Sequence, residues 1–204
     1  MDVRLKSPFT CMISGPTQSG KSQLVRRLIL ELPQVVDHPI LRIVWCYGVW
    51  QPLYEELAGI VEFVEGLSVS LNPKERTLLI IDDLMDETTD KVSKLFTRGS
   101  HHENTSVIYI VQNLFHKGKH HRTISLNAHY MIIFKKPRDM SAITQLAKQM
   151  YPGKTNFVRE SYEDATRKPY SYLFLDLKST TPDLLRLRSS IFPRDNPTVY
   201  VPKL

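Results

Sequence analysis

Gly15-Pro-Thr-Gln-Ser-Gly-Lys-Ser22 is the most informative segment of this 204-residue chain. It matches the pattern GxxxxGK[ST] at every fixed position. The apolar segment Phe9–Ser14 before it reads as a strand, and Leu24, Val25 and Leu28 after it are spaced as on one face of a helix. A glycine-rich turn between a strand and a helix directs backbone N–H groups at an anion, at the positive end of the helix dipole. The segment therefore predicts a phosphate-binding loop of the Walker A type.

Each position of this loop has an expected task at a bound ATP. Lys21 is expected to neutralise charge on the β- and γ-phosphates, and the Ser22 hydroxyl is expected to ligate Mg²⁺. The glycines allow the backbone to curl around the phosphates. The predicted phosphate-contacting residues are Gly15, Pro16, Thr17, Gln18, Ser19, Gly20, Lys21 and Ser22.

A second motif, Leu78-Leu-Ile-Ile-Asp-Asp83, is an apolar strand that ends in two acids. This is the Walker B pattern, in which the first acid completes the magnesium shell, so Asp82 is predicted to take that role. Asp83 is the candidate general base for an attacking water. The alternative interpretation is that the acids only end the strand or cap the next helix. A second acid favours ATP hydrolysis over simple nucleotide binding.

The strand predicted at Ser106–Val111 also ends in polar side chains, and Gln112 comes first among them. A strand-terminal amide can hydrogen-bond the γ-phosphate or its water, so Gln112 is predicted to sense hydrolysis. The alternative is a turn-forming role.

Strands rich in β-branched residues alternate with helical segments along the chain, which predicts an α/β fold with a mostly parallel central sheet and helices on both faces. Residues 1–178 are expected to form the ATPase core of a single domain. The proline-containing tail 179–204 is expected to pack on the core or on a neighbouring subunit. The segments predicted as strands are Phe9–Ser14, Arg42–Cys46, Thr77–Asp82, Ser106–Val111, Tyr130–Phe134 and Tyr172–Asp176.

The formal net charge of +6 favours a polyanionic partner. Basic side chains gather in the segment 116–122, which we interpret as a loop. There Lys117, Lys119 and Arg122 are candidates for contact with DNA phosphates, and a solvated loop is the alternative. No apolar run approaches the length of a membrane span, so no membrane partner is expected. Two cysteines in apolar segments indicate buried thiols in an intracellular reducing compartment, and no secretion signal is seen.

Motors of this chemistry use an arginine, often from a neighbouring subunit, to stabilise transition-state charge. Arg98 is the first candidate for this role, followed by Arg122 and Arg138. A surface salt bridge is the alternative for each of them.

Several of these segments together resemble a known family. GPTQSGKS, LLIIDDL, LFTRGSHHENTSVIYIVQN, RTISLNAHYMIIFKKPRD, PYSYLFLD and LRLRSSIFP are similar to the DNA-packaging ATPases of Polinton/Maverick elements and adintoviruses, relatives of the poxvirus packaging ATPase within the FtsK–HerA superfamily. The resemblance runs from about residue 9 to about residue 202. Members of that superfamily more often have Glu where this chain has Asp83.

The resemblance implies a RecA/FtsK–HerA-like P-loop NTPase that uses ATP and Mg²⁺ to pump double-stranded DNA into a capsid. It implies a homo-oligomeric ring, viral capsid or portal partners, and a place in the host cell, in the nucleus or with the virion. Two alternatives stay open: a nucleoside or nucleotide kinase, and a cellular HerA-like DNA translocase.

Overall fold

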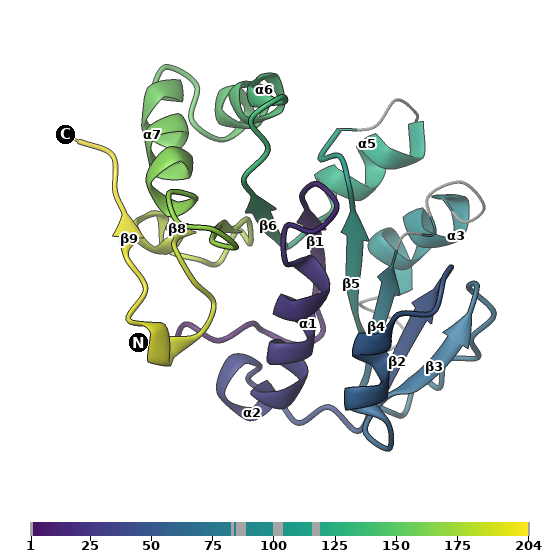
Figure 1. Ribbon diagram of the computed structural model, residues 1–204. Coiled ribbons are helices and arrows are strands. Elements are labelled where there is room, and N and C mark those ends of the chain that lie inside the picture. Colours follow the sequence, from purple (N-terminus) through teal and green to yellow (C-terminus); the bar gives the residue numbers. More distant parts are fainter. Residues whose placement is uncertain (1, 83, 85–88, 100–103, 116–118, 204) are drawn as a thin grey trace.

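The computed structural model describes residues 2–82, 84, 89–99, 104–115 and 119–203. Its centre is one nine-stranded sheet with helices on both faces (Figure 1), in the order β3-β2-β4-β5-β1-β6-β7-β8-β9. The pairs from β3 through β6 are parallel, and the pairs from β6 through β9 are antiparallel. The prediction of a mostly parallel α/β fold is therefore confirmed.

The bounds of the elements agree closely with the apolar segments of the sequence. The strands are β1 (Thr10–Ser14), β2 (Arg42–Tyr47), β3 (Glu62–Glu65), β4 (Thr77–Asp82), β5 (Thr105–Val111), β6 (Tyr130–Phe134), β7 (Tyr172–Asp176), β8 (Leu187–Arg188) and β9 (Val199–Tyr200). The helices are α1 (Lys21–Leu30), α2 (Leu32–Val35), α3 (Thr89–Lys94), α5 (Lys119–Leu126), α6 (Met140–Met150) and α7 (Thr155–Ala165), and short helical turns are η1 (Pro52–Leu57), η2 (Leu95–Gly99), η3 (Asp183–Leu185) and η4 (Pro193–Asp195).

Both faces of the sheet are covered, which explains why the central strands are apolar without alternation. Side chains along β1 point alternately to the two faces. Cys11 and Ile13 pack in the core beneath α1 and α2, while Met12 packs in the core shared by α3, α5, α6 and α7. Every residue of β1, β4 and β5 is buried.

The topology brings three strand ends to one edge of the sheet. β1 lies between β5 and β6, and the chain leaves β1 through α1 to reach β2 on the far side of β5. The register aligns Ser14 with Val111, and Asp82 with Ile110. Because parallel strands end at the same edge, the segments that follow β1, β4 and β5 converge there, at the position where α/β proteins bind ligands.

The segment after residue 178 extends the sheet, with β8 antiparallel to β7 and β9 antiparallel to β8. The boundary between core and tail stays a prediction. The interpretation of residues 116–122 as a loop is wrong from Lys119 onward, because α5 begins there. Within the described residues, no helix combines the length and the apolar character that a membrane crossing requires.

Candidate nucleotide-binding site

The loop between β1 and α1 needs glycine at two positions. A Cβ atom on Gly15 would lie 2.7 Å from Cβ of Phe134 and from Oγ of Ser19, closer than packed atoms tolerate. Gly20 precedes α1 with a φ of 100°, a left-handed backbone that side chains disfavour. Gln18 also has a positive φ, of 63°. These conformations curl the loop over the N-terminus of α1, which leaves the helix's first N–H groups available to an anion.

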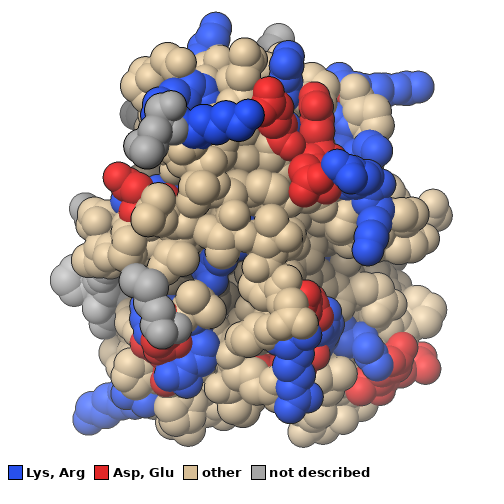
Figure 2. All heavy atoms as spheres, turned by 90° about the vertical axis from the view of Figure 1, so that its left-hand side faces the viewer, with Lys and Arg blue, Asp and Glu red and all other residues tan. Residues whose placement is uncertain are grey.

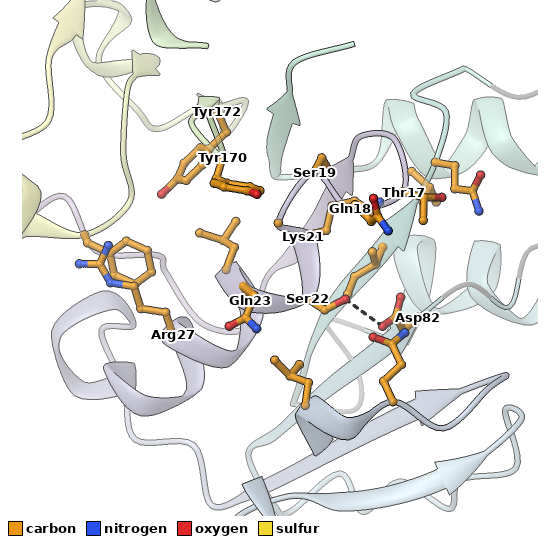
Figure 3. A pocket seen from close by; sticks show the side chains of 18 residues that line it. Thr17, Gln18, Ser19, Lys21, Ser22, Gln23, Arg27, Asp82, Tyr170 and Tyr172 are labelled. Carbon is orange, nitrogen blue, oxygen red and sulfur yellow. Dashed lines mark hydrogen bonds between the residues drawn. The ribbon is translucent and has the colours of Figure 1, made fainter. Parts of the chain in front are cut away.

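Lys21 and Ser22 open α1 and lie beneath this loop. The Lys21 ammonium donates to the carbonyl oxygens of Gly15 at 2.7 Å and Pro16 at 2.8 Å. The Ser22 hydroxyl donates to Oδ2 of Asp82 across 3.5 Å (Figure 3). The structure therefore brings together three side chains that the sequence assigned to one site: Lys21, Ser22 and Asp82.

Asp82 ends β4 and is buried, with 5% of its surface exposed. Its Oδ2 atom also accepts a hydrogen bond of 3.2 Å from the hydroxyl of Tyr54, a residue of η1. Burial, and next the negative charge of Asp82, raise the pKa of Tyr54, so this hydroxyl keeps its proton and donates. No sequence motif pointed to Tyr54. Its contact with Asp82 arises only because η1 folds back over β2 and β4.

The residues at this end of the site fit a magnesium ion. Mg²⁺ prefers oxygen ligands in an octahedral shell with bonds of about 2.1 Å, which places neighbouring ligand oxygens about 3 Å apart. The Ser22 and Asp82 oxygens are 3.5 Å apart, so a small movement accommodates the ion between them. A hydroxyl and a carboxylate are also the protein ligands that this ion takes beside phosphate oxygens.

A pocket of about 800 Å³ extends along the loop, large enough for a nucleoside triphosphate. It contains most of the predicted phosphate site together with Asp82 and Gln112. Gly15 and Pro16 belong to the same loop but do not line the pocket. Gln112 follows β5 with its side chain exposed, and its carbonyl accepts from Lys136 at 3.3 Å. The predicted site residues in the wall are Thr17, Gln18, Ser19, Gly20, Lys21, Ser22, Asp82 and Gln112.

The other end of the pocket is aromatic, and its residues were missed by sequence reasoning: Tyr170, Tyr172 and Phe192 line it together with Arg27. The Arg27 guanidinium lies 3.8 Å from the ring centre of Phe192 and donates to both carboxylate oxygens of Asp195, at 2.9 and 2.7 Å. Its hydrogen bonds to Asp195 are the main reason that the pKa of Arg27 is raised. Burial raises the pKa of Tyr172 to about 12.

The remaining predicted residues are either outside the described residues or absent from the described wall of the pocket. Asp83 and Lys117 lie outside the described residues. The backbone of Arg98 lies in η2, and that of Lys119 begins α5. Arg122 on α5 and Arg138 before α6 are exposed, and neither belongs to the wall of the pocket.

The mostly parallel α/β sheet and the geometry of the loop between β1 and α1 are those of a P-loop NTPase fold. No protein-family model matches the chain, and no curated protein matches it. Among solved structures, the fold is similar to the genome packaging NTPase B204 from Sulfolobus turreted icosahedral virus 2. In complex with ATP-γS the TM-score is 0.57 at 17% identity, and with AMPPCP it is 0.55 at 16%, each covering 100% of both chains. The cytoplasmic domain of the Thermomonospora curvata Type VII secretion ATPase EccC is also similar, with a TM-score of 0.56, 13% identity, and coverage of 85% of this chain and 24% of that chain.

Proposed function

We propose that this chain is a magnesium-dependent ATPase that drives double-stranded DNA into a viral capsid. The observation that carries the ATPase proposal is the meeting of Lys21, Ser22 and Asp82 in one pocket beneath a curled glycine loop. The packaging role is supported by the likeness to the packaging NTPase over the full length of both chains. The segments quoted above support the finer assignment to the Polinton and adintovirus type.

In this proposal, Lys21 exchanges the carbonyl oxygens of Gly15 and Pro16 for oxygens of the β- and γ-phosphates. Ser22 and Asp82 hold the magnesium ion. When bound, Mg²⁺ would supply positive charge that offsets the charge developing on the phosphates. Asp83 accepts a proton from the attacking water, and Gln112 orients that water at the end of β5. The acceptor is water, so the products are ADP and phosphate.

A homo-oligomeric ring is part of this proposal. ATPases of this chemistry use an arginine to stabilise transition-state charge, often from a neighbouring subunit. The described side chains of the pocket include no arginine on the Asp82 side. Arg98, Arg122 and Arg138 are the candidates to reach a neighbouring subunit's nucleotide. Arg122 and Arg138 are exposed, as a donor across a subunit boundary must be. Capsid or portal proteins are the proposed partners of the ring, in the nucleus of the host cell or in the virion.

Contact with DNA is proposed for Lys117, Lys119 and Arg122. The face seen in Figure 2, over α7 and the C-terminal strands, has basic and acidic side chains interspersed around an uncharged middle. Such a mixed surface does not suit a polyanion. The basic segment instead follows β5 directly, and Lys119 is seven residues along the chain from Gln112.

The test is ATP turnover with and without double-stranded DNA. We expect DNA to increase the rate and Lys21→Ala to abolish it, because the variant lacks the charge that binds the β- and γ-phosphates. Leu184→Ala, an exposed change outside the pocket, serves as the control. Turnover that requires an added nucleoside and yields a nucleoside monophosphate would instead establish a kinase. DNA stimulation without any capsid association would favour a cellular translocase.

A further inference from the structure

The nucleotide pocket has two chemically different ends (Figure 3). Asp82 lies at one end, Tyr170 and Tyr172 lie at the other, and Lys21 and Ser22 lie between them. The proposed function, on which this inference rests, places the metal and the γ-phosphate at the Asp82 end. The sugar and base of the nucleotide must then extend toward the two tyrosines.

Tyr170 has the features of a residue kept for a ligand. Its side chain is 74% exposed, so its ring is open to a ligand in the pocket. Its φ is 61°, a left-handed conformation that a bulky residue rarely adopts. The ring lies against the phosphate loop, since a Cβ atom on Gly20 would be 3.3 Å from its Cδ1 atom. Strain of this kind is typical of binding sites, where the function compensates for it.

Hydrogen bonds hold the flat faces of this end of the pocket in place. The Arg27 guanidinium is stacked on Phe192, and three of its five N–H donors are bonded to Glu31 and Asp195. The Tyr172 hydroxyl contacts Ser190 Oγ at 3.2 Å and accepts from the Ile191 N–H at 3.1 Å. These bonds fix the direction of the aromatic walls next to Tyr170.

We infer that Tyr170, with Tyr172 and Phe192 as the adjoining walls, binds the nucleotide base by stacking. Stacking on an aromatic ring tolerates different bases because each of them has a π-face, so the same ring serves adenine and guanine.

Equilibrium binding in the presence of Mg²⁺ tests this assignment, with ATP-γS, GTP-γS and inorganic triphosphate as probes. Tyr170→Gly removes the ring and suits the positive φ, so the fold is preserved. We expect this variant to bind both nucleotides about 5- to 150-fold more weakly, the range that one base stack gives, and to bind triphosphate as before. Tyr170→Trp should retain nucleotide affinity, and Leu184→Ala is the exposed control.

The outcomes separate the inference from the proposed function. Unchanged nucleotide affinity in Tyr170→Gly, or an equal loss for inorganic triphosphate, overturns the stacking role. Each of these results leaves the ATPase proposal standing. A wild-type protein that binds no nucleotide overturns both.

Discussion

Asp82 is held by hydroxyl groups from two different elements. Ser22 of α1 and Tyr54 of η1 both donate to its Oδ2 atom, at 3.5 and 3.2 Å. The Tyr54 ring is fixed by other aromatic rings, including a stacked Phe63 at 4.8 Å and Trp50 at 5.3 Å between ring centres. The packing of this aromatic cluster therefore sets the direction of a hydroxyl that orients the proposed magnesium ligand.

Tyr54→Phe should raise the Mg²⁺ concentration that nucleotide binding requires, while it preserves the ring packing. The change removes one hydrogen bond to a buried carboxylate, so the free energy of unfolding should fall by about 1.5–3 kcal/mol. The Mg²⁺ concentration for half-maximal nucleotide binding should rise several-fold, because Asp82 is less well oriented. The chain's two tryptophans, Trp45 and Trp50, both pack near Tyr54, so their fluorescence can follow the titration.

Tyr47→Phe is the matched control for this variant. Tyr47 belongs to the same cluster, with its ring centre 5.5 Å from that of Tyr54. It should change the fluorescence but not the Mg²⁺ requirement. If both variants raise the requirement equally, the effect comes from packing and the orienting role of Tyr54 is wrong.

Residues of the site could be named from the sequence where the signal was local. Lys21 and Ser22 belong to one motif, and Asp82 ends an apolar strand. The structure brings the three together, and their roles at a bound nucleotide stay predictions. Tyr54 and Tyr170 belong to no motif. Tyr54 reaches Asp82 from 28 positions away, and Tyr170 reaches Gly20 across most of the chain. Such contacts depend on the complete fold, which local patterns do not specify.

A clamp centred on Arg27, made of charged hydrogen bonds and one cation–π contact, holds the C-terminal turn η4 against helix α1. Arg27 on α1 makes a two-bond contact with Asp195 of η4, bonds Glu31 of its own helix at 2.8 Å, and covers the ring of Phe192. The Ser190 hydroxyl also donates to Asp195, at 2.8 Å. This clamp holds the tail against the aromatic end of the pocket.

Asp195→Asn should destabilise the protein in a pH-dependent way. Arg27, and then Ser190, hold the pKa of Asp195 below its ordinary value, against the opposing effect of burial. A lowered folded-state pKa stabilises the protein above the unfolded pKa of about 3.9, and this contribution is lost as pH falls through the folded value. Both side chains are more than a third exposed, so after screening we expect only about 0.5–1 kcal/mol at pH 7.

Urea denaturation of wild type and variant at neutral and acidic pH measures this difference. It should be constant near pH 7 and should shrink below about pH 4, because the carboxyl gains a proton first in the unfolded wild type and, at lower pH, in the folded protein. Asp183→Asn is the control, because its contact with Arg186 involves a carboxylate that is 84% exposed. A difference that persists unchanged in acid would mean that Asp195 acts through packing and not through its charge.

Elements were predictable where burial was continuous. The six predicted strands are all present, because runs such as β4 are apolar on both faces and need no alternation to be recognised. β3 escaped notice because its Glu-Phe-Val-Glu sequence is half exposed at the sheet's edge, and β8 and β9 are two residues each. α5 was misread because Gly118 and adjacent histidines indicated a loop, whereas packing of Ile124 in the core favours a helix.

The proposed DNA-binding segment follows, along the chain, the edge of the sheet where the proposed catalytic residues lie. β5 ends at Val111, Gln112 lines the pocket, and α5 begins at Lys119. The helix is anchored by Ile124, which packs in the core cluster that also contains side chains of β5. Val111, the residue before Gln112, packs in the same core cluster as Ile124, so a force on α5 can reach the end of β5 through packed side chains.

Replacing Lys117, Lys119 and Arg122 with alanine should flatten the dependence of DNA affinity on salt. Each phosphate contact contributes about 0.9 to the slope of log affinity against log salt concentration, so loss of three contacts lowers the slope by about 2.7. The measurement is double-stranded DNA binding across a range of salt concentrations. A second triple variant, Lys148, Lys154 and Arg159 to alanine, removes the same charge from exposed positions on α6, immediately before α7 and on α7. The net charge falls equally in both variants. An identical change of slope in both would mean that overall charge, and not a particular contact, causes the effect. A change confined to the first variant places the DNA at the start of α5.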